Sequence, residues 1–173
     1  MYVEAATRAD LETIRGAYAN AQATQRKQRA PEWPGFSDDS ILREIDDGRL
    51  YRIMDGAAIA GVFTVAYDDE AIWGDLERGA HIYLHRIART NQRANGRIMD
   101  AVMSWSFARC EELGREGLRI DTWAANPALQ AYYGTFGFSL LTTRRMGDDP
   151  RLPPHYHGLE LALMEQSLST QCT

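Results

Sequence analysis

The sequence has few cysteines and no long apolar segment. Its two cysteines among 173 residues, Cys110 and Cys172, form no disulfide framework and have no metal-ligand spacing. No apolar run reaches the ~20 residues that cross a bilayer, and charged side chains such as Glu4 and Arg8 interrupt the first residues, so we expect no leader. These absences predict a cytoplasmic protein that makes no membrane contact.

The chain also lacks an excess of positive charge. Its formal net charge is −5 at pH 7, which argues against nucleic acid as a partner, because such proteins neutralise phosphates with basic residues. Neither a Walker lysine motif nor a Gly-x-Gly-x-x-Gly turn is present, which argues against an unrelated nucleotide-binding α/β protein. Internal repeats and low-complexity segments are also missing. Small ligands and cationic acceptors remain open as partners.

What is present fits one compact domain over residues 1–173. A chain of 173 residues with 45% hydrophobic content is long and apolar enough for a single full core. Cys110 aligns with the apolar positions of a predicted helix, so we expect its thiol to be buried. The residues from about 166 onward have no periodicity and predict a frayed tail.

Hydrophobic periodicity and turn residues predict an alternating set of strands and helices. Strands are expected at residues 1–6, 50–54, 57–67, 80–88, 118–124, 139–146 and 157–165, the second and third joined by the turn Asp55-Gly56. Helices are expected at residues 11–25, 38–47 and 96–113, with Ser37 as N-cap of the second, and a short one follows Asn126. Residues 29–37, 68–79 and 147–154 are expected to be loops.

The turn between the strand at 80–88 and the helix at 96–113 predicts an anion site. Backbone N–H groups at a helix start have no intrahelical partner, and the helix dipole adds partial positive charge there. Arg93 and Arg97 add full charges, and Asn95 and Gly96 tolerate positive φ. Many strand-to-helix turns contain such residues for steric reasons alone, so the local chemistry leaves both interpretations open.

The continuation of the chain supports the anion site. A strand at 118–124 is followed by Asn126, Leu129, Tyr132 and Tyr133, and then by Gly137-Phe138. Residues 80–138 as a whole resemble the core of the GCN5-related N-acetyltransferase (GNAT) superfamily. The resemblance implies an α/β fold with a mixed, mostly antiparallel, twisted seven-stranded sheet, splayed between strands 4 and 5, with helices on both faces.

The resemblance also implies acetyl-CoA as co-substrate and assigns its contacts. The backbone of Ile87 and Ala88 would pair with the pantetheine arm. The pyrophosphate would lie on Arg93, Ala94, Asn95, Gly96 and Arg97. Arg93 and Gly96 keep the family pattern, whereas Ala94 and Ile98 stand where Gly is common, and a shifted register would place Asn95 at the final Gly. Asn126 would cap the short helix and also reach the cofactor.

The same resemblance implies a catalytic acid and suggests a base. Tyr133 lies four residues before Gly137, at the position of the family's usual general acid, where it would protonate the leaving thiolate. His85 is the preferred base because its ordinary pKa is near neutrality, although a structural histidine would fit equally well. Three weaker candidates for the base are His81, Glu70 and Asp121, and Asp121 would alternatively pair with Arg86 or Arg119.

The acceptor is expected to be a primary amine of a small molecule or peptide. Five residues from three loops of the resembled fold would bind it: Trp33, Phe36, Glu70, His155 and Tyr156. The acidic loop at 68–79 would draw a cationic amine, although charge runs are usually only solvated. His155 and His157 lack the neighbouring ligands of a metal site, so we expect no metal.

Two functional classes therefore remain in competition. The leading hypothesis is an N-acetyltransferase that works by direct attack of the amine on the thioester. The alternative is a non-catalytic acyl-CoA-binding or sensing module with the same fold. Tyr133 favours the enzyme, and the irregular loop at 93–98 favours the module. The oligomeric state stays open, a homodimer included.

Overall fold

The computed structural model describes residues 1–90, 97–152 and 154–168. The chain forms two compact units, each built from two separate stretches. The first unit contains Met1–Val65 and Leu84–Trp105, and the second contains Ala66–Tyr83 and Ser106–Thr173. Our expectation of a single domain over 1–173 stays a prediction.

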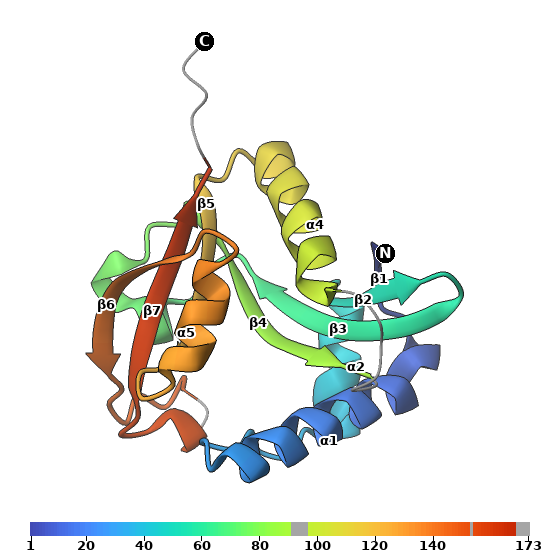
Figure 1. Ribbon diagram of the computed structural model, residues 1–173, viewed down its shortest axis with the longest axis horizontal. Helices are drawn as coiled ribbons and strands as arrows, with labels where there is room; N and C mark the ends of the chain where they lie inside the picture. Colours follow the sequence, from blue (N-terminus) through green and yellow to red (C-terminus); the bar gives the residue numbers. More distant parts are fainter. Residues whose placement is uncertain (91–96, 153, 169–173) are drawn as a thin grey trace. The chain divides into compact units, whose positions relative to one another are not determined.

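Seven strands form a mixed sheet in the order β1-β2-β3-β4-β5-β7-β6 (Figure 1). The strands are β1 (Tyr2–Ala5), β2 (Leu50–Asp55), β3 (Ala58–Ala66), β4 (His81–Arg89), β5 (Gly117–Trp123), β6 (Ser139–Arg145) and β7 (Glu160–Ser167). The pairs β1·β2, β2·β3, β5·β7 and β6·β7 are antiparallel, and β4·β5 is parallel. The register of the β4·β5 ladder comprises three residue pairs and ends at Tyr83↔Arg119. The predicted mixed, mostly antiparallel seven-stranded sheet is confirmed.

Five α-helices and three short 3-10 helices accompany the sheet in the described residues. They are α1 (Leu11–Gln28), α2 (Asp38–Asp46), α3 (Glu70–Trp73), α4 (Ile98–Leu113) and α5 (Pro127–Gly134), with η1 (Arg8–Asp10), η2 (Gly74–Leu76) and η3 (Pro154–Tyr156). The helix starts follow the sequence signals closely. Ser37 accepts a hydrogen bond from the Ser40 N–H at the start of α2, as predicted.

The first unit has helices on both faces of its strands. Ile14 and Tyr18 of α1 and Ile41 of α2 pack with Leu50 of β2 in one core cluster. Successive strand residues point to opposite faces, and Tyr51 packs its ring 4.3 Å from the ring of Trp105 in α4. The α1 and α2 helices therefore cover one face of these strands, and the first half of α4 covers the other.

The second unit has its own core around α3 and β7. Trp73 of α3 is fully buried and packs with Tyr83, Leu161 and Leu163. Four consecutive residues of β7, 161–164, are buried, because β7 is paired on both edges and covered on both faces. This strand therefore shows no alternation of buried and exposed residues over 161–164.

Three expectations about element boundaries were wrong. Residues 68–79 are not a plain loop, since α3 and η2 form there around Ile72 and Trp73, which the core buries. The α1 helix continues to Gln28 instead of ending near Gln25, because its last polar turn is exposed and needs no apolar face. The β7 strand begins at Glu160 and not at His157, because Gly158 has a φ of 74°.

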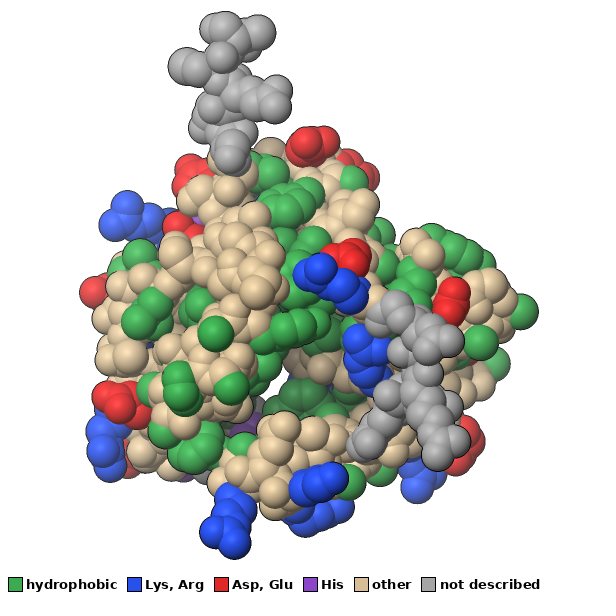
Figure 2. All heavy atoms as spheres, viewed as in Figure 1, with side chains coloured by type: hydrophobic (Ala, Val, Ile, Leu, Met, Phe, Trp, Pro, Cys, Tyr) green, Lys and Arg blue, Asp and Glu red, His purple; other side chains and the backbone are tan. Residues whose placement is uncertain are grey.

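Two further features of the described residues bear on the predictions. Cys110 is fully buried, as expected, and burial raises the pKa of its thiol to about 11. Cys172 lies outside the described residues. None of the helices in the described part of the chain is long and apolar enough to cross a bilayer. Acidic and basic side chains are interspersed on the face drawn in Figure 2.

Candidate active site

The part of β4 that follows Leu84 belongs to the first unit. Arg86 interrupts this strand, since its φ of 50° lies in the left-handed region that residues with a Cβ seldom adopt. The backbone carbonyl of His85 accepts a hydrogen bond from the Thr64 hydroxyl at 3.2 Å. The extended strand is therefore broken at a single left-handed residue, Arg86.

Ile87 and Ala88 follow this break. Ala88 is buried and Ile87 is half-buried. A Cβ on Gly61 of β3 would lie 2.8 Å from the Ala88 carbonyl oxygen, so only glycine allows this approach of the two backbones. The strand ends at Arg89, and the N–H of the next residue, Thr90, donates to the Ala60 carbonyl at 3.1 Å. Gly61 lies inside the apolar run of β3, and a glycine at such a position could have predicted this close approach from the sequence.

Only part of the predicted pyrophosphate loop lies within the described residues. Arg93, Ala94, Asn95 and Gly96 lie outside the described residues. Arg97 directly precedes α4, and its carbonyl accepts the N–H of Asp100 at 3.0 Å. Its side chain is 58% exposed, with Nε 3.5 Å from Asp100 Oδ2. Arg97 therefore lies at the helix start where the sequence predicted an anion contact, and the contact itself stays a prediction.

Trp33 and Phe36, predicted to line the acceptor site, form an aromatic cluster with Tyr18 of α1. The Tyr18 ring lies 6.1 Å from Trp33 and 4.9 Å from Phe36, and both loop rings are partly buried against the core. Gln22 donates from Nε2 to the Trp33 carbonyl at 3.0 Å, which ties the loop to α1. Packing thus accounts for much of both side chains, and a role in acceptor binding stays a prediction.

The second unit contains α5 and the end of β5. The Asn126 side chain accepts a hydrogen bond from the Leu129 N–H at 3.1 Å, and Pro127 opens the helix, so the predicted cap is confirmed. Tyr133 lies in the last turn of α5 and packs against Phe138 at 6.1 Å. Burial, and then the negative charge of Asp121, raise the pKa of the Tyr133 hydroxyl above its ordinary value.

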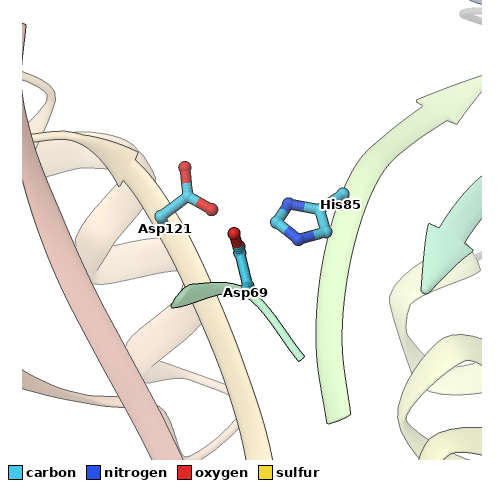
Figure 3. A group of neighbouring side chains, drawn as sticks. All are labelled: Asp69, His85 and Asp121. Carbon is cyan, nitrogen blue, oxygen red and sulfur yellow. The ribbon is translucent and has the colours of Figure 1, made fainter. Parts of the chain in front are cut away.

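Asp121 of β5 is the centre of a polar group in the second unit. The Tyr156 hydroxyl is 3.4 Å from Asp121 Oδ2, and the ring of His155 lies 4.5 Å from that of Tyr156. Carboxylate oxygens of Asp121 and Asp69, the residue before α3, lie within 4.8 Å of one another (Figure 3). The predicted residues His155 and Tyr156 are thus brought to Asp121, whereas Asp69 was expected only as one carboxylate of the acidic loop at 68–79.

Figure 3 also draws His85, the preferred base, on β4 of the first unit. Its side chain is half-buried. The weaker candidate His81 is only 6% exposed, and its Nε2 is 3.3 Å from Glu165 Oε2. Burial, and then the charge of Arg119, lower the pKa of His81. These contacts make His81 a buried residue at the start of β4 that already has a partner in Glu165.

The remaining candidates have partners in their own units. Glu70 is exposed, and its carboxylate forms an ion pair with Arg151 at 2.8 Å. Arg119 pairs with Glu165 at 2.9 Å, and Arg86 pairs with Glu44. Both arginines thus have a carboxylate partner other than Asp121.

The structural class of the chain follows from its strand order, from the left-handed residue in β4 and from the N-capped helix α5. The chain has the fold of the GNAT acetyltransferases. A GNAT-family acetyltransferase from Listeria monocytogenes superposes with a TM-score of 0.73 at 20% identity, covering 96% of this chain and 94% of that one. The ribosomal-protein-S18-alanine N-acetyltransferase of Escherichia coli superposes with a TM-score of 0.64 at 14% identity, covering 99% and 97%.

Two further comparisons concern the sequence and the cofactor. The chain is 22% identical over 140 residues to YesJ of Bacillus subtilis, described as an uncharacterized N-acetyltransferase, covering 76% of this chain and 78% of YesJ. The structure of yncA from Salmonella typhimurium, solved with its cofactor acetyl-CoA, superposes with a TM-score of 0.68 at 14% identity, covering 99% and 95%. No protein-family model matches the sequence.

Proposed function

We propose that this chain is an N-acetyltransferase that transfers the acetyl group of acetyl-CoA to a primary amine of a small molecule or peptide. The observation that carries the proposal is the position of Tyr133 in the last turn of α5, with its ring packed 6.1 Å from that of Phe138. A Tyr hydroxyl has an ordinary pKa of about 10, so it is protonated at neutral pH. A protonated hydroxyl at the family's acid position favours an enzyme over a binding module.

The residues after the break in β4 fit the cofactor. The register of the β4·β5 ladder ends at Tyr83, so it leaves the backbone of Ile87 and Ala88 without a partner on β5. Such backbone groups suit an amide-containing chain laid alongside as an extra strand. The N-terminus of α4, with Arg97 before it, suits the pyrophosphate. Acetyl-CoA would supply the activated thioester.

The proposed reaction forms one N–C bond and breaks one C–S bond. His85 takes the first proton of the bound ammonium, directly or through water, which frees the nitrogen lone pair for attack, and the second proton leaves to solvent as the amide forms. Tyr133 gives its proton to the departing sulfur and regains one from solvent. Asn126 holds the first turn of α5 and so fixes the helix that carries Tyr133.

Asp69 and Asp121 support an amine acceptor. Two carboxylates with oxygen atoms within 4.8 Å create a local negative potential that favours a cation. Tyr156 and His155 border the same carboxylate and would shape the pocket around the acceptor. The proposed acceptor is therefore a cationic primary amine, bound through the second unit.

The first experiment is calorimetric titration with acetyl-CoA, with CoA and ATP as comparison ligands. We expect micromolar binding of acetyl-CoA and CoA, and much weaker binding of ATP. A screen of amines by release of free thiol then tests turnover, with an enzyme-only blank because Cys110 and Cys172 are thiols themselves. Binding without thiol release would favour the acyl-CoA-sensing module, and no binding would contradict both.

A further inference from the structure

Arg86 places its cationic side chain in an aromatic and acidic environment inside the first unit. Its guanidinium carbon lies 4.9 Å from the centre of the Phe36 ring and 5.8 Å from that of Tyr18. Its Nη2 donates to Glu44 Oε1 of α2. The side chains of Arg86 and Glu44 are only 20% and 16% exposed. A charge pair shielded from water and stacked on aromatic rings holds its geometry better than an exposed pair.

The backbone of Arg86 has a conformation that its own Cβ disfavours. Among the described residues, the non-glycine residues with positive φ are Arg29 and Arg86. Arg29 follows the last turn of α1, where a left-handed residue is common. Arg86 lies inside a strand, where an extended conformation is the ordinary one. A residue persists in such a conformation only when its surroundings hold it there.

The contacts of the neighbouring residues depend on this conformation. The left-handed residue places the His85 carbonyl within reach of the Thr64 hydroxyl, at 3.2 Å. It also sets the position of Ala88, whose carbonyl comes so close to β3 that only Gly61 admits it. Glu44 in turn depends on Arg86, because its other oxygen, Oε2, is buried without a hydrogen-bond partner in the described part of the chain.

We propose that Glu44 and Phe36 hold Arg86 in its left-handed conformation and thereby position the backbone of Ile87 and Ala88 for acetyl-CoA. Glu44 and Arg86 are then positioning residues and do not touch the reacting atoms. The inference rests on the proposed function, because the ligand that β4 receives is the cofactor named there. It adds that contacts within the chain hold β4 in its binding conformation before the cofactor binds.

The test compares Arg86→Ala with Arg86→Asn. Both variants leave Glu44 without its cation, so the loss of the ion pair is common to both. They differ in backbone preference, since Asn adopts the left-handed region far more readily than Ala. Asp46→Asn is the matched control, because Asp46 lies on the same helix and pairs with Arg8 in an exposed position. Glu44→Gln removes the charge on the other side of the pair.

Two measurements are made on each purified full-length variant. Titration calorimetry gives the Kd for acetyl-CoA, and hydrogen-exchange mass spectrometry gives the protection of the peptide that contains residues 84–90. We expect Arg86→Ala to raise the Kd about tenfold, the factor that corresponds to ~1.4 kcal/mol. We expect Glu44→Gln to raise it less, Arg86→Asn to recover most of the loss, and Asp46→Asn to match the wild type.

Equal Kd values and equal exchange for Arg86→Ala and Arg86→Asn would overturn the inference, since the side chain would then matter only as half of an ion pair. Wild-type values in all variants would overturn it as well. A wild-type protein that does not bind acetyl-CoA would contradict the proposed function and the cofactor part of this inference. The exchange rates would still decide whether Arg86 holds the strand, so the two failures are distinguishable.

Discussion

The carboxylates of Asp69 and Asp121 approach each other in the second unit, with oxygen atoms within 4.8 Å. They come from different elements, Asp69 from the residue before α3 and Asp121 from β5. Two like charges at this separation repel each other, and a cation between or beside them relieves the repulsion. Under the proposed function, this pair would bind the protonated amine of the acceptor.

Asp121→Asn should weaken binding of the amine. We expect KM for a cationic amine to rise about tenfold, because one charged hydrogen-bond acceptor worth ~1.5 kcal/mol is lost. Steady-state kinetics at saturating acetyl-CoA gives the value. Asp148→Asn, the same change at an exposed loop position, serves as control. An unchanged KM in Asp121→Asn would remove this residue from acceptor binding.

Tyr133→Phe should lower kcat about 100-fold, at the lower end of what general acid catalysis supplies. The affinity for acetyl-CoA should stay the same, because the ring and its packing on Phe138 are retained. Single-turnover kinetics and titration calorimetry separate the two quantities. Equal turnover of variant and wild type, with equal cofactor binding, would exclude Tyr133 as the acid.

Gly61→Ala should disturb β4 next to Ala88. The new Cβ would lie 2.8 Å from the Ala88 carbonyl oxygen and 3.2 Å from Ile98 Cδ1, so the backbones must separate. We expect a loss of about 1–3 kcal/mol in the free energy of unfolding, as for overpacked cores, and weaker acetyl-CoA binding. Urea denaturation and calorimetry measure the two effects.

Gly16→Ala is the matched control for that variant. Gly16 lies in the middle of α1 and a Cβ there meets no atom within 4 Å. We expect the same substitution to stabilise the protein by ~0.5–1 kcal/mol, because Ala favours a helix over Gly. Acetyl-CoA binding should not change. Similar destabilisation in both variants would contradict the close approach of β3 and β4.

Arg119→Met should destabilise the second unit. Arg119 is 5% exposed, and it donates to Glu165 at 2.9 Å, to the Leu76 carbonyl at 2.8 Å and to the Tyr83 hydroxyl at 3.1 Å. Removing one partner of such a buried pair costs about 3 kcal/mol, and this lowers Tm by about 9 °C in a chain of this size. Differential scanning calorimetry measures the shift.

The exposed pair of Asp75 and Arg144 provides the comparison for that experiment. The Asp75 side chain is 84% exposed, so water and salt screen its attraction to Arg144. We expect Asp75→Asn to leave Tm nearly unchanged. A shift in Asp75→Asn as large as that in Arg119→Met would show that burial does not set the strength of these pairs.

Asp10 should make the protein sensitive to acid. Burial opposes ionisation of Asp10, but hydrogen bonds from Thr7 and the charge of Arg52 outweigh it, so the pKa of Asp10 is below its ordinary value of 3.8. A depressed carboxyl pKa adds stability above the unfolded pKa and loses it as pH falls through the folded pKa. The loss should therefore begin below about pH 4.

Urea denaturation at several pH values between 7 and 3 measures this loss. Asp10→Asn should be less stable than the wild type at pH 7, and its stability should fall less steeply on acidification. Parallel curves for the two proteins would mean that other carboxyl groups carry the acid sensitivity. The ion pair of Arg52 with Asp10, at 2.9 Å, is the contact that the experiment removes.

Much of the fold was predictable because local signals and tertiary packing agree. The caps at Ser37 and Asn126 each place a polar acceptor at a helix start, and both helices begin there. The mixed character of the sheet followed only from the resemblance to a family, because periodicity does not reveal strand direction. The helix α3 was missed because four residues carry too short a pattern for a period of 3.6.

The candidate site was predictable only in part, for a related reason. Tyr133 and Asn126 lie at fixed spacings in one continuous segment, which a sequence displays directly. Asp69 and Asp121 are separated by β4 and α4 in the chain, and their meeting depends on how α3 folds. The contact between Glu44 and Arg86 also joins residues that are far apart in the sequence. The left-handed φ of Arg86 could not be predicted from its residue type, because arginine does not favour it.

The division of each unit into two stretches has a consequence for the nascent chain. The first unit contains residues 1–65 but also needs Leu84–Trp105, so β3 has no β4 to pair with until the later stretch leaves the ribosome. Until then the apolar β3 exposes an open edge, the kind of surface on which unfinished chains associate. A fragment ended at Val65 would keep that edge permanently and should aggregate during expression.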